Sequence, residues 1–310
     1  MRMEARAVSR RGVLGLAVAG LTTAGLAGTG LIDAPAARAA GTAGTTAVVP
    51  DASPLGVRAP HAYLADAASG ADIWSRSSNV SVPMGSITKV MTAYVVIKAN
   101  TPGRVISVPG GIIAYDDAYS ASTAGLDPGE RLTTRDLLIA MMLPSGCDAA
   151  YALADAYGPG LSKFIAKMNA TGRALGLSHT HFNDVSGLPV GGEYTTYSSA
   201  GNLVSLGRSA MGLTLFRQIV ATRSYHLAAG SGHRAHTWDT IDPLLGRYSG
   251  ATGIKTGYTA AAGDCLLFAA TRGSKSLIGA ALHSSSSINA MSAAASDAET
   301  MLNWGFAHYR

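Results

Sequence analysis

The order of strand-like and helical segments after residue 60 constrains the fold of this chain most strongly. Short apolar runs with small turn residues between them predict strands near the start of this region and again near its end. Between the two groups, the apolar residues follow helical spacing. We therefore predict one α+β unit, in which the first and last strands complete a single antiparallel sheet flanked by helices. The predicted strands are residues 61–66, 71–75, 253–256, 265–271 and 277–282.

The helical middle of the chain is predicted from periodicity and from end signals. Apolar side chains fall on one broad face of a helix that spans 86–98. Thr133 and Asp136 precede an apolar run and are typical of a capped helix start, and Pro144 ends that helix. Together these helices form an insertion that spans roughly 86–215. The further predicted helices are residues 148–157, 162–175, 198–211 and, at the end of the chain, about 289–308.

The first 39 residues predict an export signal, which lies outside the fold. A basic start is followed by an apolar stretch at 12–32 and by Ala-Arg-Ala at 37–39, the small–x–small form of a signal-peptidase site. Residues 9–14 (Ser-Arg-Arg-Gly-Val-Leu) resemble the twin-arginine export motif. The apolar stretch also has about the length that crosses a bilayer, so a retained anchor stays open. Residues 40–59 predict a flexible lead, and 60–310 the folded domain.

Charge and composition exclude several classes of function. Hydrophobic residues make up 47% of the chain and charged residues 14%, which argues against intrinsic disorder. Of the net charge of +5, the first 39 residues carry +3, because five arginines stand against two acidic side chains. The remaining chain carries only +2 without a basic cluster, so we expect no nucleic-acid partner. Export also separates the chain from ATP and cytosolic cofactors, and we expect no cofactor.

The sequence lacks the motifs of the common metal and phosphate sites. It contains no His-Glu-x-x-His, no cysteine cluster, no Gly-x-Ser-x-Gly and no phosphate-binding loop of the Gly-x-x-x-x-Gly-Lys type. Two histidine pairs, His179/His181 and His233/His236, show no further ligand spacing. We interpret them as surface-loop residues and expect no metal site.

Ser86-Ile87-Thr88-Lys89, at the head of the helix predicted at 86–98, is the main chemical signal. Residues three apart share a helix face, so the Lys89 amine is expected beside the Ser86 hydroxyl. A serine hydroxyl attacks a carbonyl only when a base takes its proton, and an amine does so once burial or a second cation lowers its pKa. The helix amino terminus would also direct N–H groups at a developing oxyanion. Alone, the motif is more often a cap beside a solvated charge.

Two further segments carry groups of the same kind. Residues 145–148 (Ser-Gly-Cys-Asp) lie in the turn between two predicted helices, and 255–258 (Lys-Thr-Gly-Tyr) lie on a predicted strand. Lys255 beside a hydroxyl can hold a carboxylate, and Gly257 allows a substrate backbone to approach. A lone lysine on a strand is more often a solubilising edge charge. In chain order, however, the segments form the set Ser-x-x-Lys, Ser-x-Asn with Cys147 in the place of Asn, and Lys-Thr-Gly.

With these three segments the chain resembles the serine D-alanyl-D-alanine carboxypeptidase/transpeptidase family of low-molecular-mass penicillin-binding proteins. The likeness covers about residues 60–308 and includes Pro-Gly-Glu at 128–130, Met-Leu-Pro-Ser-Gly at 142–146 and Phe-Asn-Asp-Val-Ser-Gly-Leu at 182–188. It implies the α+β fold that β-lactamases and penicillin-binding proteins share. It also implies peptidoglycan stem peptides as substrates, β-lactams as inhibitors and a secreted or cell-wall-associated location. We expect a monomer.

The resemblance assigns catalytic roles to three residues. Ser86 would attack the carbonyl between two D-alanines and form an acyl-enzyme, while Lys89 takes its proton. Ser145 Oγ would pass a proton toward the leaving nitrogen and bridge Lys89 and Lys255. A β-lactam would enter the same site and leave Ser86 acylated.

The resemblance also assigns substrate contacts. Lys255 and Thr256 would bind the terminal carboxylate of the peptide. The backbone N–H groups of Ser86 and Tyr258 would form the oxyanion hole. Gly257, between Thr256 and Tyr258, would let the substrate backbone approach closely. Cys147 would stand where the acyl chain of the substrate is aligned.

Cys147 is the main departure from the family pattern. An Asn amide offers two donors and an acceptor, whereas a thiol is a weak donor and a weak acceptor. A branch of the family in actinobacteria carries Cys here, so we expect an enzyme biased toward transpeptidation. Cys147 as a small apolar filler, as a nucleophile, or as the partner of Cys265 in a disulfide stays open, although the disulfide is not the favoured interpretation.

Two alternative functions also stay open. A class A-like β-lactamase shares the motif set and needs an acidic residue to activate water, for which Asp184 and Glu193 are the candidates. A secreted, non-catalytic cell-wall-binding module would retain the cleft without turnover. A second departure, His283 followed by four serines where relatives often carry a basic residue, leaves the local substrate contact open.

Overall fold

The structure, a computed structural model, describes residues 53–287 and 292–309. The predicted export signal, most of the flexible lead and the first residues of the predicted last helix fall outside this part of the chain. Within the described residues, no helix combines the length and apolar character needed to cross a membrane.

A five-stranded antiparallel sheet joins both ends of the domain, as predicted, in the order β2-β1-β11-β10-β9. β11 lies between β1 and β10, so the first strand of the domain pairs with the last one. His61 lies opposite Leu282 in this pair. The middle of β10 and β11 is buried throughout because both faces of the sheet are covered. The strands are β1 (His61–Asp66), β2 (Asp72–Arg76), β9 (Ala251–Gly257), β10 (Cys265–Arg272) and β11 (Lys275–Leu282).

The helices predicted by periodicity are present with small shifts at their ends. Thr133 caps α3, where its side chain accepts from the N–H of Asp136, and Ser199 caps α6 in the same way. Two helices were not predicted: α2 (Gly111–Tyr119) has a single buried side chain, and α7 (Thr214–Val220) is too short to set a period. The predicted helices are α1 (Lys89–Lys98), α3 (Thr134–Met142), α4 (Cys147–Tyr157), α5 (Leu161–Ala174), α6 (Ala200–Met211) and α8 (Ala293–His308).

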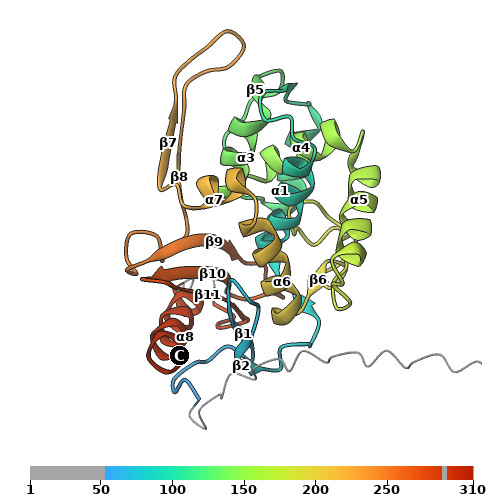
Figure 1. Cartoon of the computed structure of the whole chain (residues 1–310). Helices are drawn as coiled ribbons and strands as arrows, with labels where there is room; N and C mark the ends of the chain where they lie inside the picture. The colour runs from blue at the N-terminus through green and yellow to red at the C-terminus, as the bar shows by residue number, and fades with distance from the viewer. Residues whose placement is uncertain (1–52, 288–291, 310) are drawn as a thin grey trace, which may run out of the picture. The chain divides into compact units, whose positions relative to one another are not determined.

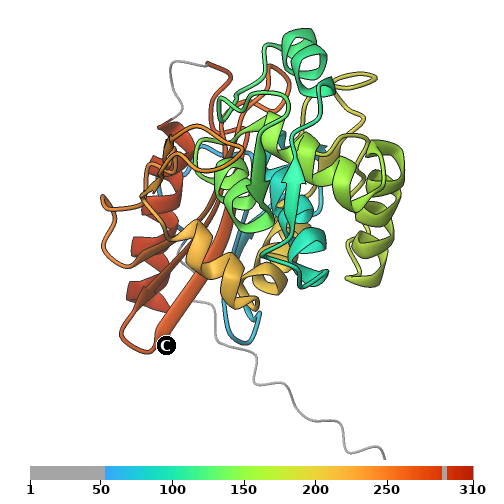
Figure 2. The same cartoon turned by 90° about the horizontal axis from the view of Figure 1, so that it is seen from above.

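Two cores lie on opposite faces of the sheet (Figures 1 and 2). α8 packs against β10 and β11 and encloses the smaller core, to which Phe268 and Met301 contribute. The helical subdomain, which contains α1 to α7, covers the other face, where α6 contacts β1 and β11. The segments 86–89 and 145–148 lie in the helical subdomain, and the segment 255–258 lies at the end of β9, where that strand meets the subdomain.

Three short strand pairs lie outside the five-stranded sheet and were not predicted from the sequence. β3 (Val82–Pro83) pairs with β6 (Tyr197–Ser198), and β4 (Val105–Ser107) pairs with β5 (Arg131–Thr133). β7 (Ser224–Leu227) and β8 (His236–Asp239) form a hairpin that extends beside α3 (Figure 1). These strands are two to four residues long, so no alternation could identify them.

Candidate active site

Ser86 lies on a 3₁₀ turn (Gly85–Thr88) that runs directly into α1, whereas the sequence predicted an α-helix from residue 86. The difference matters because side chains three apart eclipse each other on a 3₁₀ turn. Lys89, the first residue of α1, therefore lies directly beside Ser86, and its Nζ donates to Ser86 Oγ at 2.8 Å. Lys89 is 0% exposed, so the alternative of a solvated charge does not hold.

Lys89 Nζ has two further acceptors, Cys147 Sγ at 3.3 Å and the carbonyl oxygen of Ser186 at 3.2 Å. These three hydrogen bonds use the three donors of an ammonium group. The bridge that the resemblance implied, from Ser145 Oγ to Lys89 and Lys255, is not among the hydrogen bonds of the described residues. Cys147 occupies that position beside Lys89 instead.

Ser145 lies in a strained turn between α3 and α4. Its φ is +66°, a conformation that non-glycine residues adopt rarely and that clusters at functional sites. Its carbonyl oxygen accepts from Ser122 Oγ at 2.7 Å, and the N–H of Cys147 donates to the carbonyl of Ser122 at 2.8 Å. The loop at 120–122 is thereby fixed against the second signature segment.

Lys255 is buried in β9, although β9 is an edge strand where a lysine usually faces water. It is 2% exposed, and its Nζ donates to Thr256 Oγ1 at 3.3 Å. Burial, followed by repulsion from Lys89, lowers its pKa to about 7, while Asp242 and Cys147 act in the opposite direction. The charge of Lys255 therefore changes close to neutral pH.

β9 packs directly against the backbone of the turn that carries Ser86, at two glycines. A Cβ on Gly257 would lie 2.2 Å from the carbonyl oxygen of Met84, and a Cβ on Gly85 would lie 2.6 Å from the amide nitrogen of Tyr258. No L side chain fits at either position, which explains both glycines physically. The amide of Tyr258 is thereby held next to the backbone of Ser86.

Asp184 is saturated with hydrogen bonds. Oδ2 accepts from the backbone N–H groups of Ser186, Gly187 and Leu188 and from Ser186 Oγ, and Oδ1 accepts from Tyr115. These bonds fix the carbonyl of Ser186 that accepts from Lys89. Asp184 is thus a structural anchor, and it has no free oxygen with which to activate water, as the β-lactamase alternative required.

The signature residues converge on a cleft of about 450 Å³. Lys89 and Lys255 do not line it, because both lie beneath its floor. Ser120, Ala121 and Ser122, which the sequence reasoning did not single out, form one wall; no periodic pattern marks them. The lining includes Ser86, Ser145, Cys147, Thr256, Gly257, Tyr258 and, from the loop after Pro189, Glu193.

Tyr115 on α2 is a second group that sequence reasoning missed. Its hydroxyl donates to Asp184 at 2.6 Å and lies 2.7 Å from Ser186 Oγ. Burial, with the adjacent Asp184 carboxylate, raises its pKa well above the usual value. The missing signal is the helix itself, since α2 is nine residues long and buries only Ile112, so it shows no apolar face.

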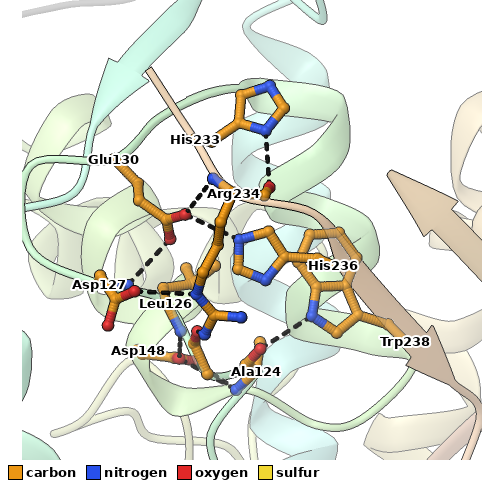
Figure 3. Close-up of polar contacts among 10 residues, drawn as sticks. Ala124, Leu126, Asp127, Glu130, Asp148, His233, Arg234, His236 and Trp238 are labelled. Atoms are coloured by element: carbon orange, nitrogen blue, oxygen red, sulfur yellow. Dashed lines mark hydrogen bonds and ion pairs between the residues drawn. The ribbon is translucent and has the colours of Figure 1, made fainter. Parts of the chain in front are cut away.

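The β7–β8 hairpin makes a network of buried polar contacts with the loop 124–130 (Figure 3). Glu130 accepts from the backbone N–H groups of Asp127 at 2.9 Å and Arg234 at 3.0 Å, and it lies 2.9 Å from His236 Nε2. Burial would raise the pKa of Glu130, but these hydrogen bonds outweigh it and hold the pKa below its usual value. His236 is buried, so its assignment to the surface was wrong. Its ring stacks on that of Trp238, with 5.0 Å between the ring centroids.

The same hairpin holds the loop that leads into the cleft wall (Figure 3). Trp238 Nε1 donates to the carbonyl of Ala124 at 2.9 Å. Asp148, the residue after Cys147, accepts from the N–H groups of Ala124 and Leu126. We call Glu130, Arg234, His236 and Trp238 the hairpin brace, because together they hold the wall that carries Ser122.

Two of the remaining candidates, Cys265 and His283, do not line the cleft. Cys147 and Cys265 are free thiols in the structure, and burial raises the pKa of Cys265 to about 12. His283 has φ +61° and lies 3.1 Å, through Nδ1, from the carbonyl of Ala262; it does not line the cleft. Across residues 53–287 and 292–309, no three or more His, Cys, Asp or Glu side chains gather as metal ligands.

Comparison with known proteins places this geometry among peptidases. Residues 47–286 match the model of the family described as D-alanyl-D-alanine carboxypeptidase. A D-alanyl-D-alanine carboxypeptidase of Streptomyces sp. strain K15 is 39% identical over 87% of this chain and 94% of its own length. D-alanyl-D-alanine carboxypeptidase DacB2 of Mycobacterium tuberculosis is 35% identical over 79% of this chain and 81% of its own. The crystal structure of the Streptomyces K15 DD-transpeptidase superimposes with a TM-score of 0.75 at 38% identity, over 81% of this chain and 98% of that one.

Proposed function

The chain belongs to the D-alanyl-D-alanine carboxypeptidase family, and from this premise we propose how its own residues perform the reaction. It is a serine-type D-Ala-D-Ala carboxypeptidase/transpeptidase that acts on peptidoglycan peptides and is inhibited by penicillin. The observation that carries the assignment of roles is the hydrogen bond between the buried Lys89 Nζ and Ser86 Oγ.

Ser86 is the nucleophile and Lys89 is its base. The 2.8 Å contact allows the serine proton to move to Nζ as soon as the amine is uncharged, and no other side chain has to rearrange. Ser86 Oγ then forms an ester with the acyl group, and the D-alanine nitrogen leaves with a proton. Ser145, which lines the same cleft as Ser86, is our candidate for delivering that proton.

The amides of Ser86 and Tyr258 form the oxyanion hole. The close packing of Gly85 against the Tyr258 amide supports this assignment, since it leaves the two amides no freedom to separate. Donors fixed in advance stabilise the tetrahedral intermediate without reorganisation, and losing one costs about 2.7–4 kcal/mol of transition-state stabilisation.

Lys255 and Thr256 bind the terminal carboxylate of the donor peptide. A pKa near 7 means that Lys255 loses its positive charge as the pH rises above neutrality. Carboxylate binding requires the ammonium form of Lys255. We therefore expect KM for a D-Ala-D-Ala peptide to increase as the pH is raised above 7. The bound carboxylate itself stabilises the ammonium form, which limits this increase.

Cys147 biases the enzyme toward transfer to an amine. Its thiol lies beside Lys89, where an Asn amide would offer strong donors and an acceptor to the acyl chain. The test is product partition: at millimolar amino acceptor, the wild type should form more transfer product than Cys147→Asn. Dominant hydrolysis in both would contradict the bias while leaving the peptidase assignment intact.

The direct test of the function is D-alanine release from a diacyl-L-Lys-D-Ala-D-Ala peptide. The wild type should release one D-alanine per peptide cleaved or transferred, whereas Ser86→Ala should release none and retain the unfolding transition of the wild type. Release by Ser86→Ala at the wild-type rate would overturn the assignment of the nucleophile.

Export supplies the location. The charge pattern at 1–39 and the Ala-Arg-Ala site support secretion through the twin-arginine route. The proposed working unit is a single chain, with 60–310 as its domain. Family members act on the cell wall outside the cytoplasm, which agrees with this route.

A further inference from the structure

The loop from Pro189 to Thr195 is built to present its tip to the cleft. Thr195 Oγ1 donates to the carbonyls of Val190 at 2.7 Å and Gly192 at 2.9 Å, and Asn183 Nδ2 donates to the carbonyl of Val190 at 2.8 Å. Gly192 has φ +133°, a conformation that only glycine adopts readily. The loop is therefore ordered by its own polar groups, and Glu193 lies at its tip.

Among the described residues that line the cleft, Glu193 has the only acidic or basic side chain. The two lysines of the site lie beneath the floor, and Asp184 is turned away into its own hydrogen bonds. In the part of the chain that the structure describes, the Glu193 carboxylate makes no hydrogen bond and no ion pair. Beside it, Tyr194 is 69% exposed, which is unusual for an aromatic ring.

An exposed carboxylate in the cleft lining, followed in sequence by an exposed aromatic residue, is suited to one kind of ligand group. A protonated amine pairs with the carboxylate, and its aliphatic chain or its charge contacts the ring. Because the lining residues that the structure describes include no basic side chain, none of them competes for the carboxylate.

We propose that Glu193, followed in the loop by Tyr194, selects peptides that carry a protonated amine apart from the reacting groups, on the donor side chain or as a second amine of the acceptor. Glu193 acts as a specificity residue that touches substrate away from the reacting bond. This inference rests on the proposed peptidase function and extends it to the class of peptide that the enzyme prefers.

The donor arm of the test compares two peptides that differ only in charge, Nα-acetyl-L-Lys-D-Ala-D-Ala with a free side-chain amine and its Nα,Nε-diacetyl counterpart. The wild type should show a kcat/KM for the free amine higher by about two- to fivefold, the range of an exposed ion pair. Glu193→Gln should lose this preference through KM, so that its kcat/KM becomes the same for the two peptides. Asp155→Asn, which removes one exposed negative charge from α4 outside the cleft, should keep the preference.

The acceptor arm uses the diacetyl donor with an added diamino acid acceptor, in which one uncharged amine attacks the acyl-enzyme and the other stays protonated. If the amine is recognised on the acceptor, Glu193→Gln should lower the ratio of transfer to hydrolysis by a similar factor, and 0.5 M salt should do the same in the wild type. The inference would be overturned if Glu193→Gln changed neither the donor preference nor the transfer ratio. Cleavage of the diacetyl peptide would in that case still uphold the proposed function. A wild type inert toward both peptides would overturn the two together.

Discussion

The floor of the cleft and the hairpin brace both bury charged groups, but they do so in opposite ways. Beneath the floor, Lys89 and Lys255 carry like charge, and their mutual repulsion with burial lowers the pKa of Lys255 to about 7. In the brace, Glu130 is met by two backbone N–H groups and by His236, and its pKa falls below the usual value because the charged form is stabilised.

The difference separates groups that react from groups that hold. A lysine with a lowered pKa is destabilised in its charged form, which costs folding free energy and gives a base or a switchable cation. A carboxylate with a lowered pKa contributes folding free energy and is chemically inert. Lys255→Met should therefore lose activity and gain stability, whereas variants of the brace should lose stability and keep their activity.

Lys89→Met should show the largest effect. Removing the base should slow acylation of Ser86 by penicillin about 10²–10⁴-fold, because proton transfer in the transition state is lost. The matched control is Lys98→Met, an exposed lysine at the other end of the same helix, which should acylate normally. Stopped-flow or gel-based labelling with a fluorescent penicillin measures both rates; equal rates would remove Lys89 from the mechanism.

Lys255→Met should weaken substrate binding and increase the free energy of unfolding. In the unfolded chain the lysine pKa is about 10.5, above its folded value, so burying it costs free energy in full below pH 7, and this cost disappears as the pH approaches 10.5. The stability gain should be a few kcal/mol at pH 7 and should shrink with rising pH. Urea denaturation at pH 7, 8.5 and 10, with exposed Lys163→Met as control, provides the measurement; a pH-independent gain would contradict the lowered pKa.

Glu130→Gln should destabilise the domain by about 1–3 kcal/mol at neutral pH, because charge-assisted hydrogen bonds in the brace are weakened. The folded pKa lies below the usual 4.5, so the contribution of Glu130 is present above that pH and is lost as the pH falls through the folded value. The difference in unfolding free energy should thus vanish in acid. Penicillin acylation should stay within a few-fold of the wild type, and a loss as large as that of Lys89→Met would erase the distinction between the two regions.

Trp238→Phe should have the smallest effect, about 1 kcal/mol, because it leaves the carbonyl of Ala124 without its donor. Trp304 is the matched control: its indole nitrogen is buried without a hydrogen-bond partner in the described structure, so Trp304→Phe removes no hydrogen bond there. Thermal unfolding of the two variants compares them directly. A larger cost for Trp304→Phe would show that ring packing, and not the hydrogen bond, explains the brace.

The sequence predicted the parts of this molecule that depend on local patterns. Ser86 and Lys89 could be paired from their spacing alone, and the sheet followed from apolar runs at both ends of the chain. The brace could not be predicted, because Glu130 and His236 are 106 residues apart and meet only through tertiary packing. For the same reason His236 was wrongly assigned to the surface, and the anchoring role of Asp184 was not visible.

The switch from an α-helical to a 3₁₀ turn at Ser86 also lay beyond the sequence pattern. It depends on the backbone of Gly85, which has φ +53° and packs against Tyr258, a residue far along the chain. That contact brings the first and third signature segments together. Periodicity within one segment carries no information about such a contact.

The mass of the protein after reaction with penicillin tests the central claim most directly. The pairing of Ser86 with the buried Lys89 predicts a single adduct, located by peptide mapping on Ser86, absent from Ser86→Ala and formed more slowly in Lys89→Met. An adduct on Cys147, or an adduct that persists in Ser86→Ala, would contradict the account.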